Sequence, residues 1–89
     1  MKTYSLTVAT PDGKVFCGDA VFLSLRGTEG DLAILADHVP FVTAVTDCDV
    51  RIETDDGTER IGHTDGGLLT VSSDEVTLLS GNFRWTDGE

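Results

Sequence analysis

The stretch DVRIETDDG, residues 49–57, decides the fold expected of this chain. Apolar and polar side chains alternate from residue 49 to residue 53, which is the period of a strand with one face on a core and the other on water. The residues Asp55-Asp56-Gly57 then supply the chemistry of a tight turn, because Asp and Gly tolerate the backbone conformations that hairpins demand. The stretch therefore predicts a half-buried strand followed by a hairpin turn.

The same pattern recurs along the chain. Alternating runs occupy residues 4–9, 21–26, 69–71 and 76–78, with a short apolar run at 14–16, and turn residues separate them at 11–13, 26–30, 65–67 and 72–74. None of these runs has the 3.6-residue period of a helix. The pattern predicts a single-domain, all-β protein, an antiparallel β-sandwich of about 8–10 short strands. We expect residues 1–82 to form the sandwich and residues 83–89 to form a partly frayed C-terminal tail.

Length and charge exclude several kinds of protein. Eighty-nine residues suffice for one core only, so a second domain is not expected. Six Lys and Arg against sixteen Asp and Glu give a formal charge of −10. Because nucleic-acid affinity comes chiefly from basic side chains that displace counterions, no nucleic-acid partner is expected. The same repulsion argues against direct binding to anionic lipid, while basic or neutral protein partners remain open.

A search for catalytic or metal-binding chemistry finds no motif. His38, His63, Cys17 and Cys48 show no spacing typical of a zinc site. Two cysteines are too few for a disulfide framework, so both are expected to be free thiols. A Cys–His nucleophilic pair is a minor alternative, because such partners meet in space rather than in sequence. No nucleophile elbow or phosphate-binding loop occurs. The sequence therefore predicts no catalytic residue, cofactor or metal.

The most informative segment is residues 27–43, in which a glycine-bracketed acid and a short strand precede a His-x-Pro turn. From the residues alone, it could equally be a structural crossover. It belongs, however, to a collinear series of short motifs: TPDG at 10–13, VFCG at 15–18, GTEGDLAIL at 27–35, HVPFVTA at 38–44, VRI at 50–52, GGLLTV at 66–71 and VTLL at 76–79. In this order, from about Thr3 to Leu79, the series resembles the N-terminal β-sandwich domain of the ε subunit of F-type ATP synthase. Ala36-Asp37 and Asp47-Cys48 stand where the family usually has Pro-Gly.

The resemblance implies a non-catalytic subunit of the rotor's central stalk. Such a subunit links the γ subunit to the membrane ring of c subunits and couples proton or sodium flow to ATP synthesis, without a cofactor. It implies a peripheral position at the cytoplasmic face of the cell membrane, with membrane association only through the complex.

The resemblance also suggests which residues face the two partners. The family's ring-facing segments match Glu29, Asp31 and His38, which would meet a basic residue on the exposed loops of the c subunits. For the γ-facing surface, Phe41, Val42 and Val45 are candidates, although ordinary core packing is the favoured explanation for them.

Two expectations concern the extent of the chain and the alternative function. The family commonly continues into a C-terminal helical hairpin that can inhibit ATP hydrolysis, so a sequence ending at residue 89 leads us to expect a form without those inhibitory helices. The first residues also lack a signal peptide, so we expect the chain to stay where it is made.

The alternative function is a stand-alone acidic β-sandwich that binds a ligand or a protein. Co-purification with γ distinguishes the two.

Overall fold

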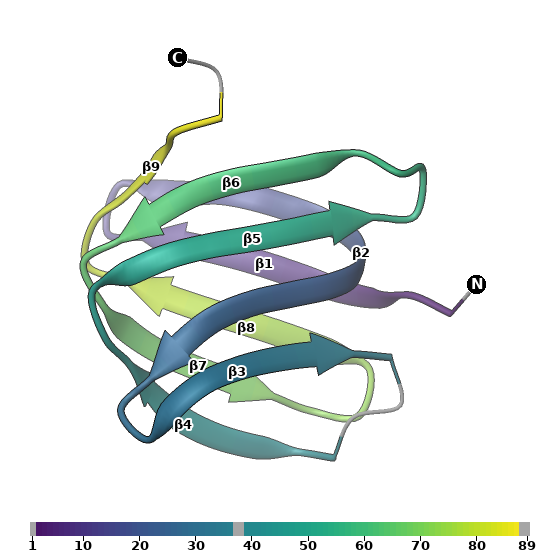
Figure 1. The fold of residues 1–89 in the computed structure, drawn as a ribbon, viewed down its shortest axis with the longest axis horizontal. Helices are drawn as coiled ribbons and strands as arrows, with labels where there is room; N and C mark the ends of the chain where they lie inside the picture. The colour runs from purple at the N-terminus through teal and green to yellow at the C-terminus, as the bar shows by residue number, and fades with distance from the viewer. Residues whose placement is uncertain (1, 37–38, 88–89) are drawn as a thin grey trace.

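The computed structural model describes residues 2–36 and 39–87 and forms nine strands within them (Figure 1). The strands are β1 (Tyr4–Thr10), β2 (Gly13–Gly27), β3 (Gly30–Leu35), β4 (Phe41–Val45), β5 (Cys48–Thr54), β6 (Glu59–Thr64), β7 (Gly67–Val71), β8 (Glu75–Ser80) and β9 (Phe83–Trp85). These described residues contain no helix. The predicted all-β sandwich of about 8–10 strands is confirmed.

The strands form two layers that share the long strand β2 (Figure 1). In one layer β4, β7, β8 and β1 pair in that order, and β1 pairs with the first half of β2. In the other layer the second half of β2 pairs with β3 and β5, and β6 and β9 follow. A register shift between Ala20 and Phe22 lies where β2 passes from one layer to the other. Such an irregularity bends a strand, so the separate runs expected at 14–16 and 21–26 are one continuous strand.

All strand pairings are antiparallel except one. Strand β1 lies parallel to β8, with Leu6 opposite Val76 and Val8 opposite Leu78. The alternation of side chains predicted both strands but not their relative direction, because the period of two is the same in parallel and antiparallel pairs.

The core lies between the layers and is made by the inward sides of all the strands except β6. It contains mostly aliphatic side chains: Tyr4, Leu6, Val8, Ala20, Leu23, Leu25, Ile34, Val45, Val50, Ile52, Leu69, Val71, Val76, Leu78 and Phe83. The Tyr4 hydroxyl donates a hydrogen bond of 2.6 Å to the Ile34 carbonyl, which satisfies a polar group inside this core. Strand β1 is therefore held to β3 by packing in the core and by this hydrogen bond.

Glycines make two of the turns possible. Gly57 in the β5–β6 turn has a φ of 88°, a conformation that side-chain-bearing residues rarely adopt. Directly after the β6–β7 turn, at the first residue of β7, a Cβ at Gly67 would overlap the carbonyl oxygen of Leu79 on β8. The close approach of β7 to β8 at this point therefore requires glycine.

The end of the described chain packs against the sandwich. Phe83 and Trp85 of β9 contact each other edge to face with 5.0 Å between ring centroids, and Arg60 lies 4.0 Å over the Trp85 ring. Asp87 forms an ion pair of 2.8 Å with Arg60 and accepts a hydrogen bond from the Ile61 amide. These contacts attach the chain to β6 up to Asp87.

Candidate interaction surfaces

The outward side of β4, β7, β8 and β1 carries two cross-strand rows of uncharged side chains. The register places Ala44, Leu68, Leu79 and Ala9 in one row and Val42, Thr70, Thr77 and Thr7 in the next. We call these eight residues the uncharged face. A row of this kind, running across four strands without a charge, is unusual in a chain with a formal charge of −10.

Three large apolar side chains of the uncharged face are exposed to solvent. Val42 is 62% exposed, Leu79 51% and Leu68 42%. Apolar side chains that gather on one surface mark sites where another molecule docks. The two leucines were not predicted as site residues, although the sequence held a signal for them. Each follows or precedes another leucine, and in a strand one of two adjacent residues must face outward.

The candidates for the γ-facing surface lie on both sides of β4. Val42 points outward into the uncharged face. Val45 is only 5% exposed and belongs to the core, and Phe41 is partly buried against that core. Of the three, Val42 alone offers a largely exposed side chain to a partner.

One end of the sandwich is strongly acidic. The β2–β3 turn, the β4–β5 connection and the β6–β7 turn meet there, at the left of Figure 1. They contribute Glu29, Asp31, Asp47, Asp49 and Asp65, all exposed, and we call these five residues the acidic end. An end with this charge is suited to a basic partner surface, since complementary potentials guide association and fix the register of docking.

The predicted ring-facing residues are only partly placed by the structure. Glu29 and Asp31 lie at the acidic end, where Asp31 pairs with Arg26 at 2.9 Å. His38 lies outside the described residues. Its described neighbours Ala36 and Val39 follow β3, and therefore lie at the opposite end of that strand from Glu29.

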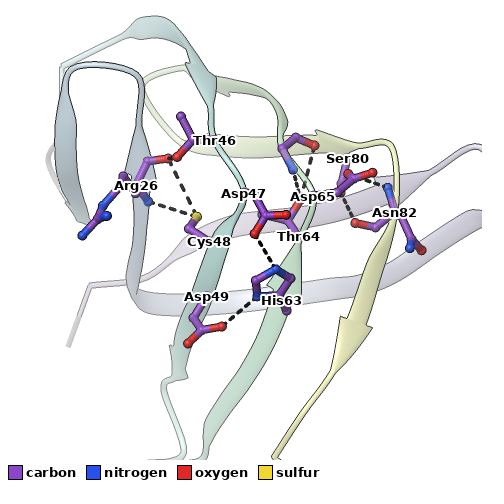
Figure 2. Close-up of polar contacts among 11 residues, drawn as sticks. Arg26, Thr46, Asp47, Cys48, Asp49, His63, Thr64, Asp65, Ser80 and Asn82 are labelled. Atoms are coloured by element: carbon purple, nitrogen blue, oxygen red, sulfur yellow. Dashed lines mark hydrogen bonds and ion pairs between the residues drawn. The ribbon is translucent and has the colours of Figure 1, made fainter.

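Next to this charge, the structure holds a histidine that was not predicted as a site residue. The His63 ring on β6 lies between two carboxylates, with Nε2 2.8 Å from Asp47 Oδ1 and Nδ1 2.9 Å from Asp49 Oδ1 (Figure 2). The register of the β5–β6 hairpin sets part of this geometry, because Asp49 is directly opposite His63. Sequence spacing gave no signal for the contact, since it needs both the hairpin register and the course of the β4–β5 connection.

Cys48 fixes the start of β5 to β2. Its Sγ accepts a hydrogen bond from the Arg26 amide at 3.3 Å and lies 3.8 Å from the Arg26 carbonyl oxygen (Figure 2). Burial raises the pKa of the Cys48 thiol, which disfavours the reactive thiolate. Cys17 is exposed, and both cysteines are free. The contacts of Cys48 are those of a structural residue rather than a nucleophile.

Two shallow hollows on the surface of the described residues lie near charged side chains. One, of about 390 Å³, lies beside the acidic end and is lined by Ser24, Leu25, Arg26, Asp31, Asp47, Cys48 and Asp49. The other, also about 390 Å³, is lined by Lys2, Val21, Phe22, Leu35, Ala36 and Glu53 on the layer that contains β3. In residues 2–36 and 39–87, no three His, Cys, Asp or Glu side chains are arranged to hold a metal ion. No helix in the same residues has the length and apolarity to span a membrane.

The fold and its surfaces define a class of protein, a small all-β domain with one uncharged face and one acidic end. The comparison with family models identifies the particular family. The chain belongs to the family described as "ATP synthase, Delta/Epsilon chain, beta-sandwich domain", whose model matches residues 3–86.

Curated relatives give the same result. The chain is 39% identical over 80 residues to the ATP synthase epsilon chain of Alkalihalophilus pseudofirmus and 40% identical over 80 residues to that of Bacillus velezensis. Each match covers 90% of this chain, which spans 59% and 60% of those two relatives.

Solved structures show the same fold. One match, with a TM-score of 0.87 and 19% identity, is in the Euglena gracilis mitochondrial ATP synthase and covers 93% of this chain and 53% of that one. Another, with a TM-score of 0.77 and 12% identity, is in the central stalk and c-ring structure of the Tetrahymena thermophila enzyme and covers 93% and 66%.

Proposed function

We propose that this chain is a non-catalytic subunit of the central stalk of an F-type ATP synthase. In this role it links γ to the c-ring and helps to couple proton or sodium flow to ATP synthesis. It would be peripheral to the membrane, on the cytoplasmic face, and held there by the complex. Family membership supports the proposal, as do the names of the curated relatives.

The observation that carries the proposal is the uncharged face. A domain with a formal charge of −10 leaves two rows of side chains without a charge and exposes Val42, Leu68 and Leu79 there. Exposed side chains of this kind gain free energy when a partner covers them, because burial removes apolar area from water. We assign this face to γ, with Val42 retained from the predicted residues. Phe41 and Val45 support it from the core side of β4.

The acidic end is assigned to the c-ring. Glu29 and Asp31 face solvent there and would meet basic side chains on the loops of the ring. Because the Asp31 carboxylate already pairs with Arg26, Glu29 is the stronger candidate for a direct contact. His38 stays a prediction from the family pattern alone, and it is not among the five residues of the acidic end. Exposed charges at such a surface affect the rate and register of docking more than the final affinity.

Co-purification tests the proposal. The chain is expressed with tagged γ of the same synthase, and separately with a tagged unrelated protein as a control. Retention by γ alone is the expected result. A chain that folds but is not retained by γ, at any salt concentration, would contradict the proposed role and favour a stand-alone binding module.

A further inference from the structure

The contact of His63 with two carboxylates depends on its protonation state. A neutral imidazole has one N–H and can donate to one acceptor, whereas the imidazolium can donate from both nitrogens. The carboxylates of Asp47 and Asp49 lie 2.8 and 2.9 Å from the two ring nitrogens. An ionised carboxylate can only accept, so both contacts are hydrogen bonds only when the ring carries two protons.

The charged groups around the ring favour that protonated form on balance. The hydrogen bond to Asp49 raises the pKa of His63 most, and the hydrogen bond and charge of Asp47 raise it further. Partial burial and the positive charge of Arg84, the residue opposite His63 on β9, lower the pKa by less. From β5, Arg51 also lies on the outward side of the sheet, where it pairs with Glu59 at 2.6 Å.

The two carboxylates differ in how firmly they are held. Asp49 lies within β5, where its backbone is in register with His63. Asp47 lies in the short connection between β4 and β5, outside any strand. Both side chains are largely exposed, 69% for Asp47 and 77% for Asp49, so the backbone alone distinguishes the two carboxylates. Within the part of the chain that the structure describes, the only hydrogen-bond partner of the Asp47 carboxylate is His63. Loss of the Nε2 proton would place two acceptors 2.8 Å apart, and Asp47 is the partner that is free to move away.

We propose that His63 is a protonation-controlled clasp that holds the β4–β5 connection against β6. Below its titration midpoint the imidazolium bridges Asp47 and Asp49. Above it, the contact with Asp49 remains and the contact with Asp47 is lost, so the connection moves and the acidic end becomes more negative. The clasp is a property of this domain alone and does not depend on the proposed function.

The neighbouring contacts confine the movement. Thr46 remains attached to β2, since its amide donates to the Arg26 carbonyl oxygen at 3.0 Å. Cys48 remains attached to the same residue through its Sγ. The change is therefore expected at Asp47, between two fixed points, and not as an opening of the sandwich.

Nuclear magnetic resonance of the 89-residue chain tests the clasp. The protonation of both His63 ring nitrogens and the backbone amide shifts of residues 46–49 are followed from pH 5 to pH 9 in the wild type. The same titration is made for Asp47→Asn, for His63→Gln and, as a matched control away from the clasp, for Asp55→Asn.

The expected result has three parts. His63 carries two ring protons below its midpoint and its pKa lies above the ordinary histidine value, the Asp47 amide shifts with the same midpoint, and that shift is absent in His63→Gln. The midpoint falls in Asp47→Asn and stays unchanged in Asp55→Asn. The proposal is overturned if the pKa of His63 is not above the ordinary histidine value, or if the Asp47 amide does not follow its titration. It is equally overturned if Asp47→Asn leaves the midpoint where it was.

Discussion

Replacing the three large side chains of the uncharged face should weaken binding to γ about a hundredfold. The perturbation is the triple variant Val42→Thr, Leu68→Thr and Leu79→Thr. Threonine keeps the preference for a strand and removes most of the apolar area. The three side chains point away from the core, so the variant is expected to fold.

The magnitude follows from how much of each side chain is left to bury. The exposed fractions of 62%, 42% and 51% mean that about half of each side chain is still in contact with water. Full burial of a Val or Leu side chain stabilises by about 1.5–3 kcal/mol, so covering the exposed half contributes about 1 kcal/mol at each position. The three together give about 3 kcal/mol, or about two factors of ten in the dissociation constant.

Isothermal titration calorimetry with purified γ measures the effect, and circular dichroism melting confirms that the variant is folded. The matched control is Leu35→Thr, because Leu35 is 57% exposed but lies on β3 in the other layer. Its affinity for γ should equal that of the wild type. A folded triple variant that binds as tightly as the wild type would refute the assignment of this face.

Three further predictions address the acidic end, the core and the turns. Glu29→Lys should slow association with the c-ring, most strongly at low salt, whereas Asp74→Lys in the turn between β7 and β8 should not, as stopped-flow or surface plasmon resonance would show. Gly67→Ala should destabilise the domain by at least about 2 kcal/mol in urea unfolding, since its Cβ would overlap a carbonyl oxygen of β8; unchanged stability would mean that β7 and β8 can separate there at little cost. Hydrogen bonds, first from the Thr54 hydroxyl and then from Thr58, lower the pKa of Asp56 to about 2, so its contribution to stability is present above about pH 4 and is lost as the pH falls toward 2. The melting temperature of Asp56→Asn should therefore depend less on pH in that window than that of the wild type. The same pH dependence of the melting temperature in both proteins would contradict this.

Local patterns predicted the elements of this fold well. The alternation at residues 49–53 corresponds to β5, in which Val50 and Ile52 are fully buried and Arg51 is exposed. The turn at 55–57 is present, with Gly57 at positive φ. These features depend on neighbours a few residues away, so their physical cause is visible in the sequence.

Features that depend on long-range contacts were not visible. The parallel pairing joins β1 to β8, about 70 residues later in the sequence, and the continuous course of β2 depends on a bulge near Val21. Neither changes the hydrophobic period. The sequence therefore predicted more and shorter strands around residues 14–26 than the structure contains.

The interaction surfaces were predicted only in part, for the same reason. Glu29 and Asp31 could be proposed together because they lie in one short segment, and their contact with the c-ring stays a prediction. Leu68 and Leu79 were not, because they become neighbours only through the register of β7 and β8. Val45, predicted for the γ-facing surface, is in the core, since alternation along β4 points it to the side opposite Val42. The residues of a surface that crosses several strands can be predicted only once the pairing of those strands is known.

Disulfide or photo-cross-linking in the assembled synthase tests the central claim most directly. A cysteine is placed at Leu79 in one variant and at Leu35 in another, both with Cys17 replaced by serine so that the exposed native thiol does not react. We predict that the probe at Leu79 cross-links to γ and that the probe at Leu35 does not. Cross-linking to γ from Leu35 alone, with none from Leu79, would contradict the account.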